Sequence, residues 1–96
     1  MFVVYGTIDL HLPYSTSLKE KRKTVHAVIA RIRKRFNVSV SEVDYHELWQ
    51  RSQIGFSAVT ANFAESDLII SAIKETIYQY SDQAELINFL FNHITV

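Results

Sequence analysis

The stretch PYSTSLKEKRKTVHAVIARIRKRFNVSVSEV, residues 13–43, carries the strongest secondary-structure signals in the chain. Pro13 ends an alternating segment, because proline cannot donate to a strand ladder. Ser17, with Glu20 three residues later, forms a capping box that predicts the start of a helix. Apolar residues then recur at helical spacing until Asn37, and VSVSEV has the β-branched alternation of a strand. A helix followed directly by a strand is therefore predicted.

The segments on either side extend this pattern. Residues 2–12 alternate between two sides, as a half-buried strand does. A polar loop over residues 45–50 separates VSVSEV from a third predicted strand, QIGFSAVTA. Asn62 and Glu65 form a second capping box, which predicts a second amphipathic helix. The segment AELINFLFNHITV is predicted to be the last strand.

This βαββαβ order predicts an α+β fold, the ferredoxin-like sandwich, with a four-stranded antiparallel sheet and two helices on one face. We expect a single domain over residues 1–96, because no linker or repeat interrupts the chain. The last strand has apolar residues on both sides. One set is Ile87, Phe89 and Phe91, and the other is Leu86, Leu90 and Ile94. Because helices cover only one set, we expect the open sheet face, with Val3 and Tyr5, to form a homodimer.

The composition excludes several classes of protein. The chain has no cysteine, which excludes disulfides and thiol chemistry and removes the commonest structural zinc ligand. The first apolar run has neither the basic segment nor the cleavage site of a signal peptide, and no stretch is long enough for a membrane span. We therefore expect a cytoplasmic protein with no cofactor and no membrane contact.

The formal net charge of zero hides an uneven distribution. Between residues 19 and 35, a single acid accompanies eight bases, namely Lys19, Lys21, Arg22, Lys23, Arg31, Arg33, Lys34 and Arg35. At 100° per residue, six side chains form one arc of the first helix: Lys19, Arg22, Lys23, His26, Arg33 and Lys34. Cations in the last turn complement the helix dipole, but those in the first two turns oppose it. This arrangement indicates that the helix meets an anion.

Three kinds of anion are candidates for binding the basic arc: the protein's own acids, the acids of another subunit, and phosphates. Phosphate is the leading hypothesis, with RNA or a ribosomal particle as the partner of a non-enzymatic accessory protein. The residues expected to contact it are Lys19, Arg22, Lys23, Arg33 and Lys34. The alternatives are a dimeric interaction module that binds an acidic protein, and a face that is only solvated. The aromatic signature of an RNA recognition motif is absent.

The segment EVDYHELWQR, residues 42–51, supports a third hypothesis, a small metal-dependent hydrolase built on Asp44, His46 and Glu47, with His11 as a candidate neighbour. Strong ligand spacings and a nucleophile with its base are missing, so we expect no catalytic residue and no metal site. Trp49 and Arg51 are candidate loop anchors. We expect Trp49 to pack on the core or a partner, and Arg51 to extend the basic surface or pair with an acid of the loop.

The words SLKEKR, RFNVSV, EVD and LWQR, within residues 11–51, resemble the signature of the YlxP-like family of small bacterial proteins, a family of unknown function. The resemblance extends through IGFSAVTAN and the second helix. It implies a ferredoxin-like fold and no established activity, cofactor or substrate. Genes of this family often neighbour those of translation initiation and ribosome-binding factors, which implies a role near RNA or the ribosome. The last strand, LINFLFNHITV, departs from the acidic strand of the relatives.

Overall fold

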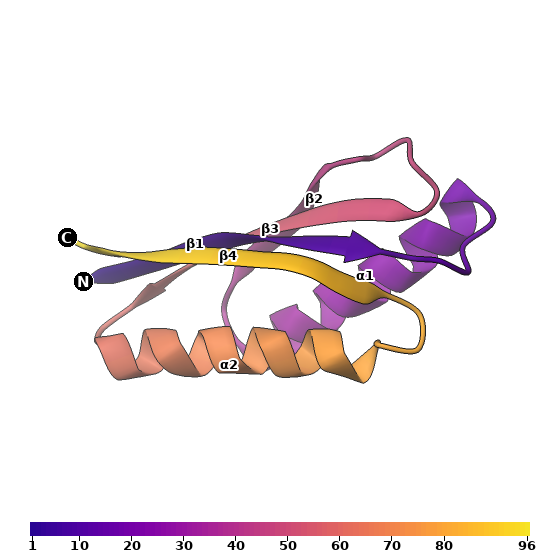
Figure 1. Ribbon diagram of the computed structural model, residues 1–96. Coiled ribbons are helices and arrows are strands. Elements are labelled where there is room, and N and C mark those ends of the chain that lie inside the picture. The colour runs from indigo at the N-terminus through magenta and orange to yellow at the C-terminus, as the bar shows by residue number, and fades with distance from the viewer.

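The computed structural model describes residues 1–96, and its elements follow the predicted order. The strands are β1 (Phe2–His11), β2 (Ser39–Asp44), β3 (Arg51–Thr60) and β4 (Glu85–Thr95), and the helices are α1 (Leu18–Arg35) and α2 (Phe63–Gln79). The strands form one antiparallel sheet in the order β2-β3-β1-β4. Both helices cover the same face of this sheet (Figure 1). The predicted ferredoxin-like sandwich is confirmed. Neither helix is long and apolar enough to cross a lipid bilayer.

Both predicted helix starts are confirmed by their hydrogen bonds. The Ser17 hydroxyl accepts from the Glu20 backbone N–H at 3.1 Å, and the Asn62 side chain accepts from the Glu65 N–H at 2.9 Å. In return, the Glu20 carboxylate accepts from both the N–H and the hydroxyl of Thr16, at 2.7 and 2.9 Å. These bonds satisfy donors that a helix N-terminus leaves without partners.

The core lies between the sheet and the two helices. Alternate residues of the central strands are buried against α1 and α2, including Val4, Ile8 and Leu10 of β1 and Ile54 and Phe56 of β3. Gly6 belongs to the same side of β1, where an added Cβ would lie 2.8 Å from the Phe56 ring. The alternation therefore requires glycine at this point, because the Phe56 ring takes the space of a side chain.

A bulge in β4 corrects one sequence-based assignment. Asp9 pairs with Asn88 and Leu10 with Leu86, so Ile87 is an extra residue without a partner in β1. Leu86 therefore shares the helix-covered side with Leu10, and its predicted place on the same side as Leu90 and Ile94 is wrong. A strand pattern assigns sides by strict alternation, and a single inserted residue shifts everything beyond it.

The other assignments in β4 are confirmed by its pairing with β1. Leu90 pairs with Thr7 and Ile94 with Val3, so both lie on the open face as expected. Phe89 and Phe91 lie on the opposite side, toward α2, where the Lys74 ammonium sits 5.3 Å from the centre of each ring. The open face is thus apolar mainly along β4 and the adjoining part of β1.

Candidate nucleic-acid interface

The basic arc consists of six side chains on the outer side of α1, and all six are exposed: Lys19, Arg22, Lys23, His26, Arg33 and Lys34. The structure contains three ion pairs, His11–Glu85, Lys21–Glu42 and Arg35–Glu75. None of them involves the arc. The protein's own acids therefore neutralise Lys21 and Arg35 but leave the arc without a counter-charge.

Arg33 is the one member of the arc held in place by the protein itself. Its guanidinium donates to the Val40 carbonyl of β2 at 2.8 Å. It also lines a shallow groove of about 380 Å³ between α1 and β2, together with His26 and Ser41. This bond uses one of the five guanidinium donors and leaves the others free for a ligand.

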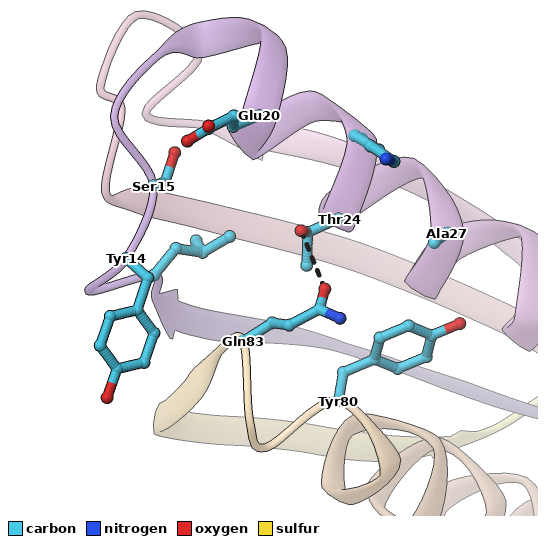
Figure 2. A pocket seen from close by; sticks show the side chains of 9 residues that line it. Tyr14, Ser15, Glu20, Thr24, Ala27, Tyr80 and Gln83 are labelled. Carbon is cyan, nitrogen blue, oxygen red and sulfur yellow. Dashed lines mark hydrogen bonds between the residues drawn. The ribbon is translucent and has the colours of Figure 1, made fainter.

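Lys23 connects the arc to the largest hollow of the surface, about 470 Å³ in volume. The hollow lies between α1 and the segments that flank β1 and β4, with Tyr14 and Tyr80 on two of its sides (Figure 2). Inside it, the Thr24 hydroxyl donates to the Gln83 side chain at 3.2 Å. The Tyr14 side chain is 77% exposed, so its ring is available to a ligand next to Lys23.

Lys21, which is not part of the arc, is the one base of α1 that lies in the interior. Its side chain is fully buried, and its ammonium lies 3.2 Å from the Glu42 carboxylate. The same ammonium donates to three backbone carbonyls, those of Tyr45 at 2.7 Å, His46 at 3.2 Å and Arg51 at 3.2 Å. A buried charge is tolerated only when it is paired and hydrogen-bonded in this way. The anion that binds Lys21 is thus Glu42 of the same chain and not an external partner.

A sequence signal for this burial exists. At 100° per residue, Lys21 falls within the apolar stripe of α1 beside Val25 and Ile32, both of which are buried. A lone cation on an apolar stripe indicates a buried partner, and Glu42 was the acid nearest to the predicted core in the following strand. The number of charges in the segment does not indicate that Lys21 is buried, because it takes no account of the helix face on which each charge lies.

The candidate loop anchors occupy different environments. Trp49 is 55% exposed and Leu48 is 47% exposed, so Trp49 does not pack on the core, because the bonds from Lys21 already hold the loop. Arg51 is half-buried, with its guanidinium 4.7 Å from the centre of the Tyr45 ring, and it forms no ion pair with Asp44 or Glu47. Tyr45 itself has a φ of 63°. The loop is anchored by its backbone.

The residues of the hydrolase hypothesis do not converge. The Asp44 carboxylate accepts from the Tyr45 N–H at 2.7 Å, and the His46 ring lies 3.2 Å from the Glu42 carbonyl. His11 lies 3.2 Å from Glu85 of β4. No three histidine or carboxylate side chains come close enough together to hold a metal ion. The geometry therefore gives this hypothesis no support.

Residues from several segments of the family signature meet at the buried Lys21. Lys21 belongs to SLKEKR, its partner Glu42 to EVD, and Arg51 to LWQR, so three of the signature words meet at one ammonium. A family model described as "Protein of unknown function (DUF503)" matches residues 3–90. The chain belongs to this family.

Within the family, the chain is similar to "Uncharacterized protein YlxP" from Bacillus subtilis (strain 168). The two are 39% identical over 51 residues, which make up 53% of this chain and 55% of the relative. The alignment thus spans about half the length of the curated relative that the chain matches.

Solved structures share the fold at low sequence identity. A VAO-type flavoprotein from Myceliophthora thermophila C1 superposes with a TM-score of 0.62 at 10% identity, over 97% of this chain and 18% of that chain. A de novo designed protein with a ferredoxin fold, LFR1, superposes with a TM-score of 0.56 at 13% identity, over 98% and 84% of the two chains. These similarities establish the architecture alone.

Proposed function

We propose that this protein is a cytoplasmic, non-enzymatic accessory protein whose basic arc binds the phosphate backbone of RNA, either free or within a ribosomal particle. The observation that carries the proposal is a set of exposed cations, Lys19, Arg22 and Lys23 among them, none of which forms an ion pair with an acid of the chain. Each cation near a helix N-terminus costs about 0.3 to 1 kcal/mol. An external anion removes that cost.

The spacing of the arc suits a phosphate backbone. Among Lys19, Arg22, Lys23 and His26, helical neighbours are three or four residues apart, which places their Cβ atoms about 5 to 6 Å from one another. Arg33 follows seven residues after His26, roughly 10 Å further along the helix axis. From Lys19 to Lys34 the arc spans roughly 22 Å along the helix axis. A surface of this length can contact several successive phosphates of one strand.

Tyr14 favours an RNA with unpaired bases over a regular duplex. Its exposed ring belongs to the same hollow that Lys23 lines. Aromatic rings stack on splayed bases while cations hold the backbone, which is the usual mode of recognition for single-stranded RNA. We therefore expect loops or single strands of ribosomal RNA to bind more tightly than helical segments.

The test is fluorescence-anisotropy titration of ribosomal RNA fragments at several salt concentrations. With about four phosphates neutralised, the logarithm of the affinity should fall with the logarithm of the salt concentration with a slope of about −3. The double variant Lys19→Glu/Lys23→Glu should lose binding. The control Arg31→Glu/Arg35→Glu makes the same change in charge on α1 outside the arc and should bind nearly as tightly as the wild type.

Circular dichroism of each variant verifies that the fold is intact. Equal losses from the two double variants would mean that only net charge matters, and the assignment to the arc would be wrong. Absence of binding even at low salt would exclude the RNA proposal altogether.

A second candidate function is an interaction module for an acidic protein. It is favoured by Trp49 and Leu48, which are exposed on the loop that Lys21 ties to the first turns of α1. Exposed aromatic side chains next to cations are typical of protein interfaces. Competition for the arc by polyglutamate as effective as that by RNA would favour this candidate.

A further inference from the structure

β4 is a long edge strand whose protection against pairing is limited to the bulge at Ile87 near its start. It extends over eleven residues and pairs only with β1, so the backbone groups on its outer side are free. It contains no lysine, arginine or proline, and its only acid, Glu85, is its first residue. Natural edge strands normally carry such residues because a bare edge recruits another strand.

The other edge of the sheet is shorter and carries acids within the strand, Glu42 and Asp44. β2 has six residues, an irregular register near Glu42, and a carbonyl at Val40 that is covered by Arg33. The free edge at β4 is therefore a property of that strand and not of the sheet as a whole.

Large apolar side chains line the β4 edge on both faces of the sheet. The exposed fractions are 46% for Leu86, 51% for Ile87, 58% for Leu90, 42% for Phe91 and 45% for Ile94. The adjoining flank of α2 adds Phe63, which is 54% exposed and stacks on His93, and Tyr78, which is 78% exposed and lines a hollow with Leu86. Together they form a continuous apolar border.

We propose that a second copy of this chain pairs antiparallel with β4, so that the two sheets join into one continuous sheet with Leu90 at the two-fold axis. In this register Phe89 lies opposite Phe91, and Asn88 lies opposite Asn92. Over the central residues 88–92, residues that share a face in one copy meet residues of the same face in the other, which is what antiparallel pairing requires. Beyond this segment the bulge at Ile87 places Leu86 and Ile94 on different faces, so the regular pairing is confined to the centre of the strand.

The apolar side chains of α2 that lie beside β4 also meet each other in this register. Phe63 lies beside His93 near the end of β4, and Tyr78 lies beside Leu86 near its start. A two-fold axis through Leu90 sets one end of β4 against the other, so Phe63 of each copy approaches Tyr78 of the second. The centre of the contact thus places Leu90 against Leu90 and Phe89 against Phe91, with paired asparagines on either side and Lys74 over the two rings on the helix side.

The charge distribution supports a second copy as the occupant. The bonds from Lys21 to Glu42 and from Arg33 to Val40 fasten α1 over the β2 side of the molecule. Edge pairing through β4 therefore keeps the Arg33 end of each basic arc away from the contact, so that these ends do not repel each other. The Glu85 residues of the two copies also lie at opposite ends of the paired strands. Since β4 has no other acid and no lysine or arginine, no like charges meet along the paired strands.

Sedimentation velocity of the full chain tests the proposal. The wild type should be a dimer at micromolar concentration. Leu90→Lys places two ammonium groups at the axis and should weaken dimerisation by about 30-fold or more. The control Val59→Lys changes a residue that is 65% exposed on the open face opposite Val3, away from the edge, and should alter the dimer dissociation constant by less than about threefold.

Tyr78→Ser provides a second variant that does not disturb the sheet, and it should weaken the dimer several-fold with an unchanged circular dichroism spectrum. A monomeric wild type would overturn the proposal. So would an equal effect of Val59→Lys and Leu90→Lys, because that result would assign the contact to the open face. The basic arc takes no part in this contact, so its outcome is independent of RNA binding.

Discussion

Lys21 is the residue that joins the first helix to the β2–β3 loop. Its ammonium has three protons and lies within hydrogen-bonding distance of three carbonyls, with the Glu42 carboxylate as counter-ion. The Ser52 hydroxyl donates to the same carboxylate at 2.6 Å. Because every charged atom has a partner, the burial of this pair is tolerated.

Replacement of Lys21 by methionine should destabilise the fold strongly. The change keeps the volume but leaves Glu42 buried without a cation, which costs about 3 to 5 kcal/mol. Urea denaturation measures the loss. The control Lys19→Met, two residues away on the exposed arc, should change stability by about 0.5 kcal/mol or less. A loss of less than about 1 kcal/mol in Lys21→Met would contradict the structural role.

At the scale of the element, the start of α1 combines a strong cap with unfavourable charge. Glu20 is the only acid among the first turns, and the N–H and hydroxyl of Thr16 donate to it. These two hydrogen bonds hold the pKa of Glu20 below its ordinary value of 4.5, the backbone bond having the larger effect. The cap therefore offsets part of the cost of Lys19, Arg22 and Lys23.

The cap should make stability depend on pH. Since the pKa of Glu20 is lower in the folded state, its ionised form stabilises the protein above pH 4.5, and this contribution is lost as the pH falls through the folded-state pKa. Urea denaturation near neutral pH and well below pH 4.5 should show a smaller acid-induced loss in Glu20→Gln than in the wild type. Glu47→Gln, which removes an exposed loop carboxylate, should keep the wild-type pH dependence. Identical profiles for Glu20→Gln and the wild type would contradict the prediction.

At the scale of the whole molecule, cations and apolar surface lie at opposite edges of the sheet. The basic arc belongs to the β2 side, and the bare strand edge belongs to β4. A net charge of zero lets two copies associate without overall repulsion. One edge is thus suited to an anionic partner and the other to a second copy.

Dimerisation should appear in the thermal stability. Folding coupled to association makes the melting temperature rise with protein concentration, whereas a monomer shows no such dependence. Differential scanning calorimetry over a wide range of concentration should therefore show a rising melting temperature for the wild type and a constant one for Leu90→Lys. A constant value for both proteins would mean that the folded chain does not associate in this range.

The sequence alone predicted the element order, both capping boxes and the alternating sides of the first strand. These features are local, because a cap is formed within four residues and strand alternation follows from a period of two. The exposure of the basic arc also followed from helical periodicity. The ferredoxin-like fold could therefore be predicted from the sequence.

Only the tertiary structure decided three features: the internal partner of Lys21, the exposure of Trp49, and the bulge at Ile87. Each depends on residues far apart in the chain. The Lys21 pair requires α1 to pack on β2, and the bulge appears only when β4 is aligned with β1. Trp49 is exposed because the loop is held by backbone carbonyls bound to Lys21, and no local pattern encodes that contact. Local periodicity determines which elements form, whereas long-range packing determines which charges and edges are left for partners.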